Sequence, residues 1–396
     1  MYISAFAISS LPRVIFGDGT LKRVPELAAE FGNRALLVTG ASSFRNSPHR
    51  DQLTAGLQTC GIAWETLVIA GEPSPQLVDE AAARFRNSGI EVVIGIGGGS
   101  VLDAAKAIAG LLRVNHSVMD YLEGVGPELP YAGPAVPFIA VPTTAGTGSE
   151  ATRNAVLSVQ GADGFKKSFR DESLVARYAV VDPQLLATCP RQQIAANGMD
   201  ALTQLLESFV SLKANPITDA LALSGMRAVR DSLLPWYDGQ GDMTAHRRAM
   251  AYGALLSGIT LAQAGLGSVH GLASPLGAFF PMPHGVVCGT LVAACTAANL
   301  SVLMRRDAHN PALAKYAEVG RLLADRRDLA DDAAHAALLE ILSAWTQWLK
   351  LPPLSDYGMA AADIPKVVAN CRGSSMKTNP LVLTDGEVAE ILQERL

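Results

Sequence analysis

The sequence lacks the features that mark several classes of protein. Its 396 residues contain no block of lysine and arginine, and the net charge is −5, so we expect neither a nucleic acid nor an anionic membrane as a partner. The N-terminal stretch has no basic segment followed by an apolar core and a cleavage site, which argues against a secretory signal. No apolar run approaches the roughly 20 residues that cross a bilayer. We therefore expect a cytoplasmic protein with small-molecule ligands and no membrane partner.

Paired cysteines are also missing. The five cysteines are odd in number and show no CxxC or CxxH spacing, which favours free thiols in a reducing compartment. Cys288 and Cys295 lie seven residues apart in an apolar run, and we interpret both as packing residues.

The pattern of strands and helices divides the chain into two parts. Short β-branched runs such as ALLVTG (35–40), EVVIGIGGG (91–99) and PFIAVPTT (137–144) alternate with helical stretches up to about residue 184, which is typical of parallel βαβ units. Beyond this point apolar residues recur at helical spacing. We expect an α/β dinucleotide-binding domain over residues 1–184 and an all-α domain over residues 185–396 that binds metal and substrate.

A glycine-rich turn joins a strand to a helix in GIGGGSVLDAAK (95–106). Gly97, Gly98 and Gly99 allow a ligand to approach the backbone, and the start of the following helix offers free N–H groups to a pyrophosphate. A plain tight turn is the alternative. Asp103 and Lys106 could form an ordinary surface pair on this helix, or Lys106 could lean towards the cofactor.

A second polar loop, VPTTAGTGSEAT (141–152), follows the next strand. Its hydroxyls and glycine amides suit a ribose or a nicotinamide amide, and both loops should open at the same edge of one sheet. The strand ending at Gly40 is followed by no carboxylate until Asp51, although such a group commonly binds the adenosine ribose. A 2′-phosphate would meet no repulsion there, and Arg45 could accept it, so the cofactor is NAD or NADP.

Two histidines in glycine- and proline-broken apolar surroundings, His270 and His284, follow Asp200 by about seventy residues. Two imidazoles and a carboxylate can hold a divalent first-row metal and leave positions for a substrate oxygen. Gln204 lies one helical turn after Asp200 and can reach the same centre. The alternative is that the histidines are buried and bonded to backbone carbonyls.

With these motifs in order, GGGSxxDxAK, PTTAGTGSE, DAxxxxxE, HGxAxPLG and PHG, the chain resembles the iron-containing (group III) alcohol dehydrogenase family over essentially its whole length. The resemblance implies hydride transfer between NAD(P) and an alcohol or carbonyl carbon, a divalent metal (Fe²⁺ or Zn²⁺) in a cleft between two domains, and a homodimer. It assigns the metal ligands to Asp200, Gln204, His270 and His284. It assigns cofactor contacts to Gly40, Ser74, Gly97, Gly98, Gly99, Ser100, Asp103, Thr143, Thr144, Thr147 and Lys166.

The chain departs from the family at two positions. Relatives have histidines where this chain has Gln204, a metal-ligand position, and Ser274, a position near the active centre. An amide oxygen is a weaker ligand than imidazole for iron or zinc, and Ser274 must replace a group that could relay a proton. These departures keep two alternatives open, a metal-independent reductase and a catalytically silent nucleotide-binding relative. A lyase of the dehydroquinate synthase type is a third alternative.

The sequence contains few features that indicate the substrate. Arg372, Ser374, Ser375 and Lys377 gather in one loop of the helical part, and Arg153 follows the second polar loop. They could bind an anionic group of the substrate, or the loop could be an ordinary solvated connection.

Overall fold

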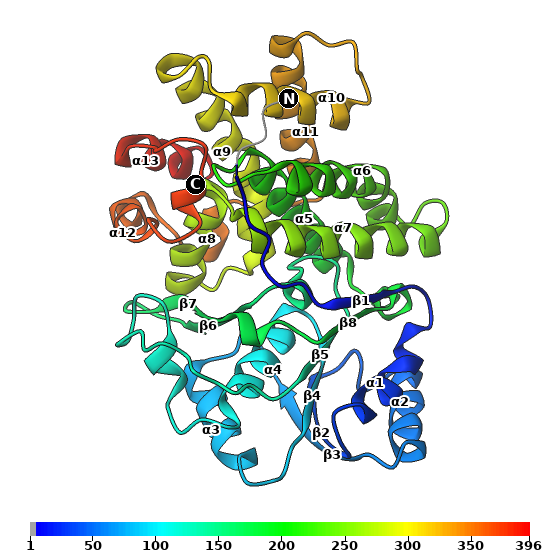
Figure 1. The fold of residues 1–396 in the computed structure, drawn as a ribbon. Coiled ribbons are helices and arrows are strands. Elements are labelled where there is room, and N and C mark those ends of the chain that lie inside the picture. The colour runs from blue at the N-terminus through cyan, green and yellow to red at the C-terminus, as the bar shows by residue number, and fades with distance from the viewer. Residues whose placement is uncertain (1–4) are drawn as a thin grey trace. The chain divides into compact units, whose positions relative to one another are not determined.

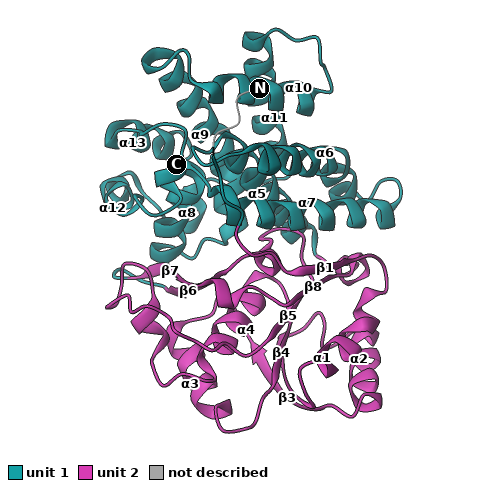
Figure 2. Cartoon of the chain, viewed as in Figure 1, with its two compact units in different colours: residues 1–8, 160–163, 190–396 teal, residues 9–159, 164–189 magenta. Residues whose placement is uncertain are grey.

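The computed structural model describes residues 5–396 and divides into two compact units (Figures 1 and 2). The α/β unit consists of Ser9–Val159 and Gly164–Cys189. The helical unit consists of Pro190–Leu396 and Gln160–Asp163, together with residues 5–8. The domain boundary expected at residue 184 stays a prediction.

Eight strands and four α-helices build the α/β unit. The strands are β1 (Arg13–Phe16), β2 (Arg34–Gly40), β3 (Ala63–Ile69), β4 (Val92–Gly97), β5 (Phe138–Pro142), β6 (Asn154–Val159), β7 (Phe165–Arg170) and β8 (Tyr178–Val181). The helices are α1 (Val24–Ala29), α2 (Pro48–Thr59), α3 (Pro75–Phe85) and α4 (Gly99–Leu111).

Six of these strands form one parallel sheet in the order β1-β8-β5-β4-β2-β3. Because strand residues alternate between faces, Leu36 and Val38 pack on one side with α3 and α4, whereas Ala35 and Leu37 pack on the other with α1 and α2. Helices on both faces explain why the central strands are almost wholly apolar.

The strand order reverses between β2 and β4. From β2 the chain continues outward to β3, and from β4 it continues outward in the opposite direction to β5. Ligands of such sheets bind at the carboxyl ends of the strands beside the reversal. The loops that follow Gly40 and Gly97 start at this place.

The remaining two strands, β6 and β7, pair antiparallel in a separate hairpin. The sequence analysis recognised neither as part of a hairpin. The apolar side of this hairpin packs on α4, where Phe169 lies against Gly110.

Nine α-helices form the part of the helical unit that the structure describes. They are α5 (Arg191–Val210), α6 (Pro216–Asp238), α7 (Met243–Ala264), α8 (Ser268–Phe279), α9 (His284–Arg306), α10 (Pro311–Ala324), α11 (Asp331–Trp348), α12 (Ile364–Asn370) and α13 (Asp385–Glu394). Helix α5 packs against α6, α7, α9 and α10 and is buried on all sides from Gly198 to Val210. A helix in this position is normally apolar all round, yet α5 carries Asp200, Gln204 and Glu207.

Helix α9 corrects the expectation that no apolar run in the sequence is long enough to cross a bilayer. By length and composition it could cross a membrane, with a mean hydropathy of 1.9 over its most apolar window. In the structure 72% of that window is buried, as in the core helix of a globular unit. Its apolar character is thus explained by packing against α5, α8 and α11.

Candidate functional site

The glycine turn lies where the sequence places it, between the end of β4 and the start of α4. A Cβ atom on Gly97 would lie 2.5 Å from Val101, and one on Gly99 would lie 2.8 Å from Thr147. These positions therefore have no room for a side chain. The first N–H groups of α4 receive no side-chain cap from Gly98, so the turn keeps donors available for a phosphate.

The second polar loop adjoins this turn, as expected for neighbouring parallel strands. The amide of Thr143 donates to the Gly97 carbonyl at 2.9 Å, and Gly98 lies opposite Thr144. On the other side of β4, a Cβ on Gly40 would be 3.6 Å from Val101 in α4. Three of the predicted cofactor-contacting segments thus meet at one edge of the sheet.

Asp103 and Lys106 are not a surface pair, and this interpretation is wrong. Lys106 is fully buried, and its Nζ donates to the carbonyls of Ser149 (2.8 Å) and Asn154 (2.6 Å) and to the Thr152 hydroxyl (3.0 Å). Because these acceptors occupy the ammonium, Lys106 does not lean towards a cofactor. Asp103 accepts from the Ser149 hydroxyl at 2.5 Å. The two side chains fasten the second polar loop to α4.

Ser74 lies at the turn before α3, and Lys166 reaches this turn from strand β7. The Ser74 hydroxyl caps α3 by accepting from the Leu77 amide at 3.1 Å. Lys166 in β7 forms an ion pair at 2.6 Å with Glu72, two residues before Ser74. The structure therefore brings these two predicted cofactor contacts near each other through Glu72, which the sequence analysis did not single out.

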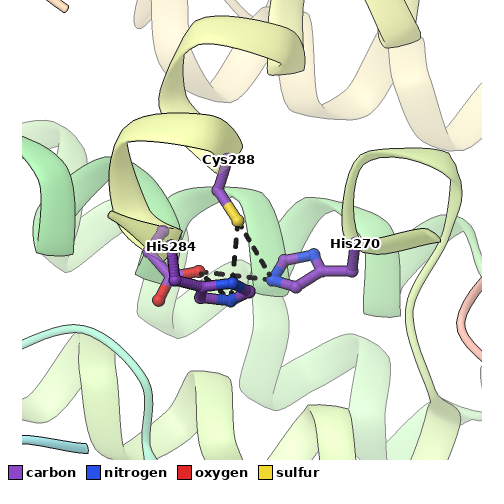
Figure 3. A group of neighbouring side chains, drawn as sticks. His270, His284 and Cys288 are labelled. Carbon is purple, nitrogen blue, oxygen red and sulfur yellow. Dashed lines mark hydrogen bonds and ion pairs between the residues drawn. The ribbon is translucent and has the colours of Figure 1, made fainter. Parts of the chain in front are cut away.

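In the helical unit, a cluster of donor atoms gathers at the buried centre (Figure 3). Asp200 comes from α5, His270 from the first turn of α8, and His284 begins α9. His270 Nε2 lies 3.2 Å from Asp200 Oδ1, and His284 Nε2 lies 3.8 Å from the same oxygen. Three of the four residues predicted as ligands, Asp200, His270 and His284, therefore converge.

The fourth member of the cluster is Cys288, which corrects its interpretation as a packing residue. Its Sγ lies 3.5 Å from His270 Nε2 and 3.7 Å from His284 Nε2. All four donor atoms lie within 4.8 Å of one another. The available signal was the four-residue spacing from His284, which becomes informative only if a helix begins at that histidine.

Glu207 contacts His270 at the ring nitrogen that faces away from Asp200. Its Oε2 lies 2.6 Å from His270 Nδ1, and its Oε1 accepts the Val269 amide at 2.7 Å. Gly267, the residue before α8, supplies no side-chain cap, so a carboxylate from α5 does this instead. With Nδ1 donating to Glu207, Nε2 faces Asp200 and Cys288 and would bind an ion once it loses its proton, the arrangement found behind metal-bound histidines.

The amide of Gln204 is engaged on both sides. Its Nε2 donates to Asp200 Oδ1 at 3.2 Å, and its Oε1 accepts from the Ser257 hydroxyl at 2.8 Å. The oxygen is the atom that could coordinate an ion, and it faces Ser257. This arrangement speaks against Gln204 as a ligand. Ser274 lies one turn after His270 on α8, and its role stays a prediction.

The electrostatics of the cluster favour a positive charge at its centre. Burial raises the pKa of Asp200, but His284 and His270 outweigh burial and hold that pKa below its usual value. Burial lowers the pKa of His270, while Cys288, Asp200 and Glu207 raise it well above its usual value. Asp200 Oδ2 is buried without a hydrogen-bond partner among residues 5–396. An orphaned carboxylate oxygen in a field that attracts cations fits a divalent metal ion.

Both arginines considered for substrate binding are paired with carboxylates. Arg372 forms an ion pair with Asp385 at 2.6 Å, and Arg153 pairs with Glu172. In the same loop as Arg372, Thr378 anchors the backbone by donating to the Leu266 carbonyl at 2.6 Å.

Known proteins match this chain along its length. The family model described as iron-containing alcohol dehydrogenase matches residues 12–183, and the model for the C-terminal part of that family matches residues 194–396. An NAD-dependent methanol dehydrogenase from Bacillus methanolicus is 28% identical and covers 97% of this chain and 98% of its own length. Alcohol dehydrogenase 4 from Schizosaccharomyces pombe is 31% identical, and the match covers 100% of this chain and 90% of the other protein.

A solved structure of a 1,3-propanediol oxidoreductase superimposes with a TM-score of 0.87 at 27% identity, over 99% of this chain and 100% of the other. These matches confirm the predicted fold class and the interpretation as an oxidoreductase of the alcohol dehydrogenase type. They favour it over the lyase and the silent relative. The chain belongs to the iron-containing alcohol dehydrogenase family.

Proposed function

We propose that this protein is a metal-assisted, NAD(P)-dependent dehydrogenase that interconverts a small alcohol and its carbonyl partner. The observation that carries the proposal is the convergence of Asp200 and His270, which are buried, and His284, which is half-buried, in one cluster. A divalent ion held there would polarise the substrate oxygen as a Lewis acid while the nicotinamide gives or takes hydride.

The surrounding residues would keep the ligands in position. Glu207 fixes the ring orientation of His270 and supports the start of α8. Gln204 donates to Asp200 Oδ1 and so directs the other carboxylate oxygen away from itself. Ser274, one turn along from His270, is the hydroxyl that we propose for proton relay.

The glycine turn would bind the pyrophosphate of the cofactor through the first N–H groups of α4, including that of Ser100. Thr143, Thr144 and Thr147 line the adjoining loop and would contact the nicotinamide half. Asp103 would act indirectly, since it holds Ser149 in that loop. Ser74 and Lys166 would contribute from the turn around Glu72.

The residues at and beside the end of β2 support the acceptance of NADP as well as NAD. Gly40 places no carboxylate directly at the strand end, and a cavity of about 420 Å³ beside β2 is lined by Arg45 and Arg50, together with one carboxylate, Asp51. Two guanidinium groups near this strand end would tolerate a 2′-phosphate.

The proposal also includes the oligomeric state, the cellular location and the charge of the substrate. We propose a homodimer, as the family resemblance implies, in the cytoplasm, a reducing compartment that suits five free cysteines. The substrate would be a small alcohol or aldehyde, and an anionic one would have to displace the ion pair of Arg372 with Asp385.

The test is metal content together with activity. Protein purified without chelator is analysed for iron and zinc, and reduction of NAD and of NADP is followed with a panel of short-chain alcohols before and after metal removal. Asp200→Ala is expected to abolish both metal content and turnover, whereas His309→Ala, at an exposed histidine of the same unit, leaves both unchanged. Full activity in metal-free protein would refute the metal-assisted mechanism.

A further inference from the structure

We propose that Cys288 is a ligand of the metal ion and takes the coordination position that Gln204 does not fill. This proposal rests on the proposed function, because it concerns the ion held by Asp200, His270 and His284. It changes the expected donor set from three residues and an amide oxygen to two imidazoles, one carboxylate and one thiolate.

Three of four separations between the donor atoms match the edges of a tetrahedron around a single ion. Zinc lies about 2.3 Å from sulfur and about 2.0–2.1 Å from nitrogen or oxygen, so tetrahedral angles separate sulfur from nitrogen by about 3.6 Å and nitrogen from oxygen by about 3.3 Å. The separations of Cys288 Sγ from the two histidines are 3.5 and 3.7 Å, and that of His270 from Asp200 is 3.2 Å. The edge from His284 to Asp200, 3.8 Å, is somewhat longer.

The direction of the thiol supports the same conclusion. Figure 3 shows the Cys288 side chain descending from α9 towards the space between the two imidazole rings. Cys288 lies one helical turn after His284, so α9 supplies both ligands from one face. Cys295, two further turns along the same helix, is not part of the cluster.

The donor set would also supply negative charge to a buried divalent ion. Binding would release the thiol proton to solvent, leaving a thiolate and the Asp200 carboxylate as direct ligands beside two neutral imidazoles. Asp200 and Cys288 are almost wholly buried, and Glu207, hydrogen-bonded to His270 Nδ1, adds a second carboxylate next to the ligands.

A thiolate ligand changes which metal the site selects. Sulfur is a soft donor, and a tetrahedral set of sulfur, nitrogen and oxygen suits Zn²⁺ or Co²⁺ better than a set of imidazoles and carboxylate alone. Four protein ligands also close the tetrahedron, so a substrate oxygen would bind as a fifth ligand, an expansion that catalytic zinc sites undergo.

Cobalt replacement tests the ligand directly by absorption rather than by turnover. The full-length protein is stripped with a chelator and loaded with Co²⁺. Thiolate coordination is expected to give a near-ultraviolet sulfur-to-cobalt charge-transfer band, which Cys288→Ser abolishes and the matched variant Cys295→Ser retains. Gln204→Ala is expected to keep the band, and Cys288→Ser to raise the metal dissociation constant at least roughly tenfold.

The outcomes separate this proposal from the proposed function. Tetrahedral cobalt bands without the charge-transfer band, with equal affinity in Cys288→Ser, would overturn the cysteine ligand and leave the metal-assisted mechanism intact. No binding of Co²⁺ or Zn²⁺ by the unmodified protein would overturn both. If the Cys288 variant does not fold, X-ray absorption of the unmodified zinc protein decides, since a sulfur neighbour at about 2.3 Å supports the ligand and a shell of only nitrogen and oxygen refutes it.

Discussion

Replacing Glu150 by glutamine should stabilise the protein at pH 8 much more than at pH 5. Glu150 lies in the second polar loop and is only 3% exposed. Burial raises its pKa from 4.5 to about 7, although its own backbone amide and Lys106 act in the opposite direction. The folded protein therefore keeps this carboxyl group protonated in a pH range where the unfolded chain has already lost the proton.

The sign of the effect follows from proton binding. Between pH 4.5 and 7 the unfolded state binds fewer protons than the folded state at Glu150, so the free energy of unfolding falls as the pH rises. With pKa values of 4.5 and about 7, the loss is about 0.8 kcal/mol at pH 5 and about 3.3 kcal/mol at pH 8. Glu150→Gln removes this loss, so its advantage should widen by about 2.5 kcal/mol between the two pH values.

In the unmodified protein, Lys106 titrates mainly above this pH range. Burial lowers the pKa of Lys106 to about 8, while Asp103 and Glu150 act against that shift. Its folded pKa is below the unfolded value, so its contribution to stability rises with pH between about 8 and 10.5. The assay is urea unfolding at pH 5 and pH 8, followed by circular dichroism, with Glu26→Gln at an exposed position of α1 as the control. An equal stability difference at both pH values would refute the reasoning.

Two further substitutions test the site in each unit. Glu207→Gln is expected to weaken metal binding about 10- to 100-fold, because the carboxylate that contacts His270 Nδ1 loses its charge. Chelator competition measures the metal affinity, with Glu318→Gln at an exposed position as the control. Equal affinities of Glu207→Gln and the unmodified protein would contradict the role assigned to Glu207. Gly99→Ala is expected to weaken NAD(P) binding roughly tenfold, because the added Cβ would lie 2.8 Å from Thr147 and displace the adjoining loop. Calorimetric titration measures the dissociation constant of the cofactor. An unchanged dissociation constant would show that the turn does not bind the cofactor.

The parts of the structure that depend on local sequence could be predicted. The turn at Gly97–Gly99 is recognisable because glycines between an apolar strand and a helix serve one local geometry. Asp200, His270 and His284 stand out because such side chains are rare in apolar surroundings. The parallel sheet follows from the alternation of strands and helices.

The parts that depend on distant partners could not be predicted. Lys106 looked like a surface residue, since its acceptors at Ser149 and Asn154 are more than forty residues away. Cys288 looked like packing because its sequence neighbours are apolar, and only the convergence of α5, α8 and α9 reveals its partners. The hairpin of β6 and β7 escaped recognition because FKKSFR alternates only weakly between apolar and polar residues.

The spacing of the buried polar groups on α5 sets how this helix can change in evolution or design. Asp200 and Glu207 are seven residues apart, which is close to two turns, so they lie on nearly the same side of the helix. One inserted or deleted residue between them would rotate Glu207 by about 100°, away from both the amides of α8 and His270. Substitutions can be tested one at a time along this segment, but a change in its length would separate the Asp200 carboxylate from Glu207, the group that orients His270.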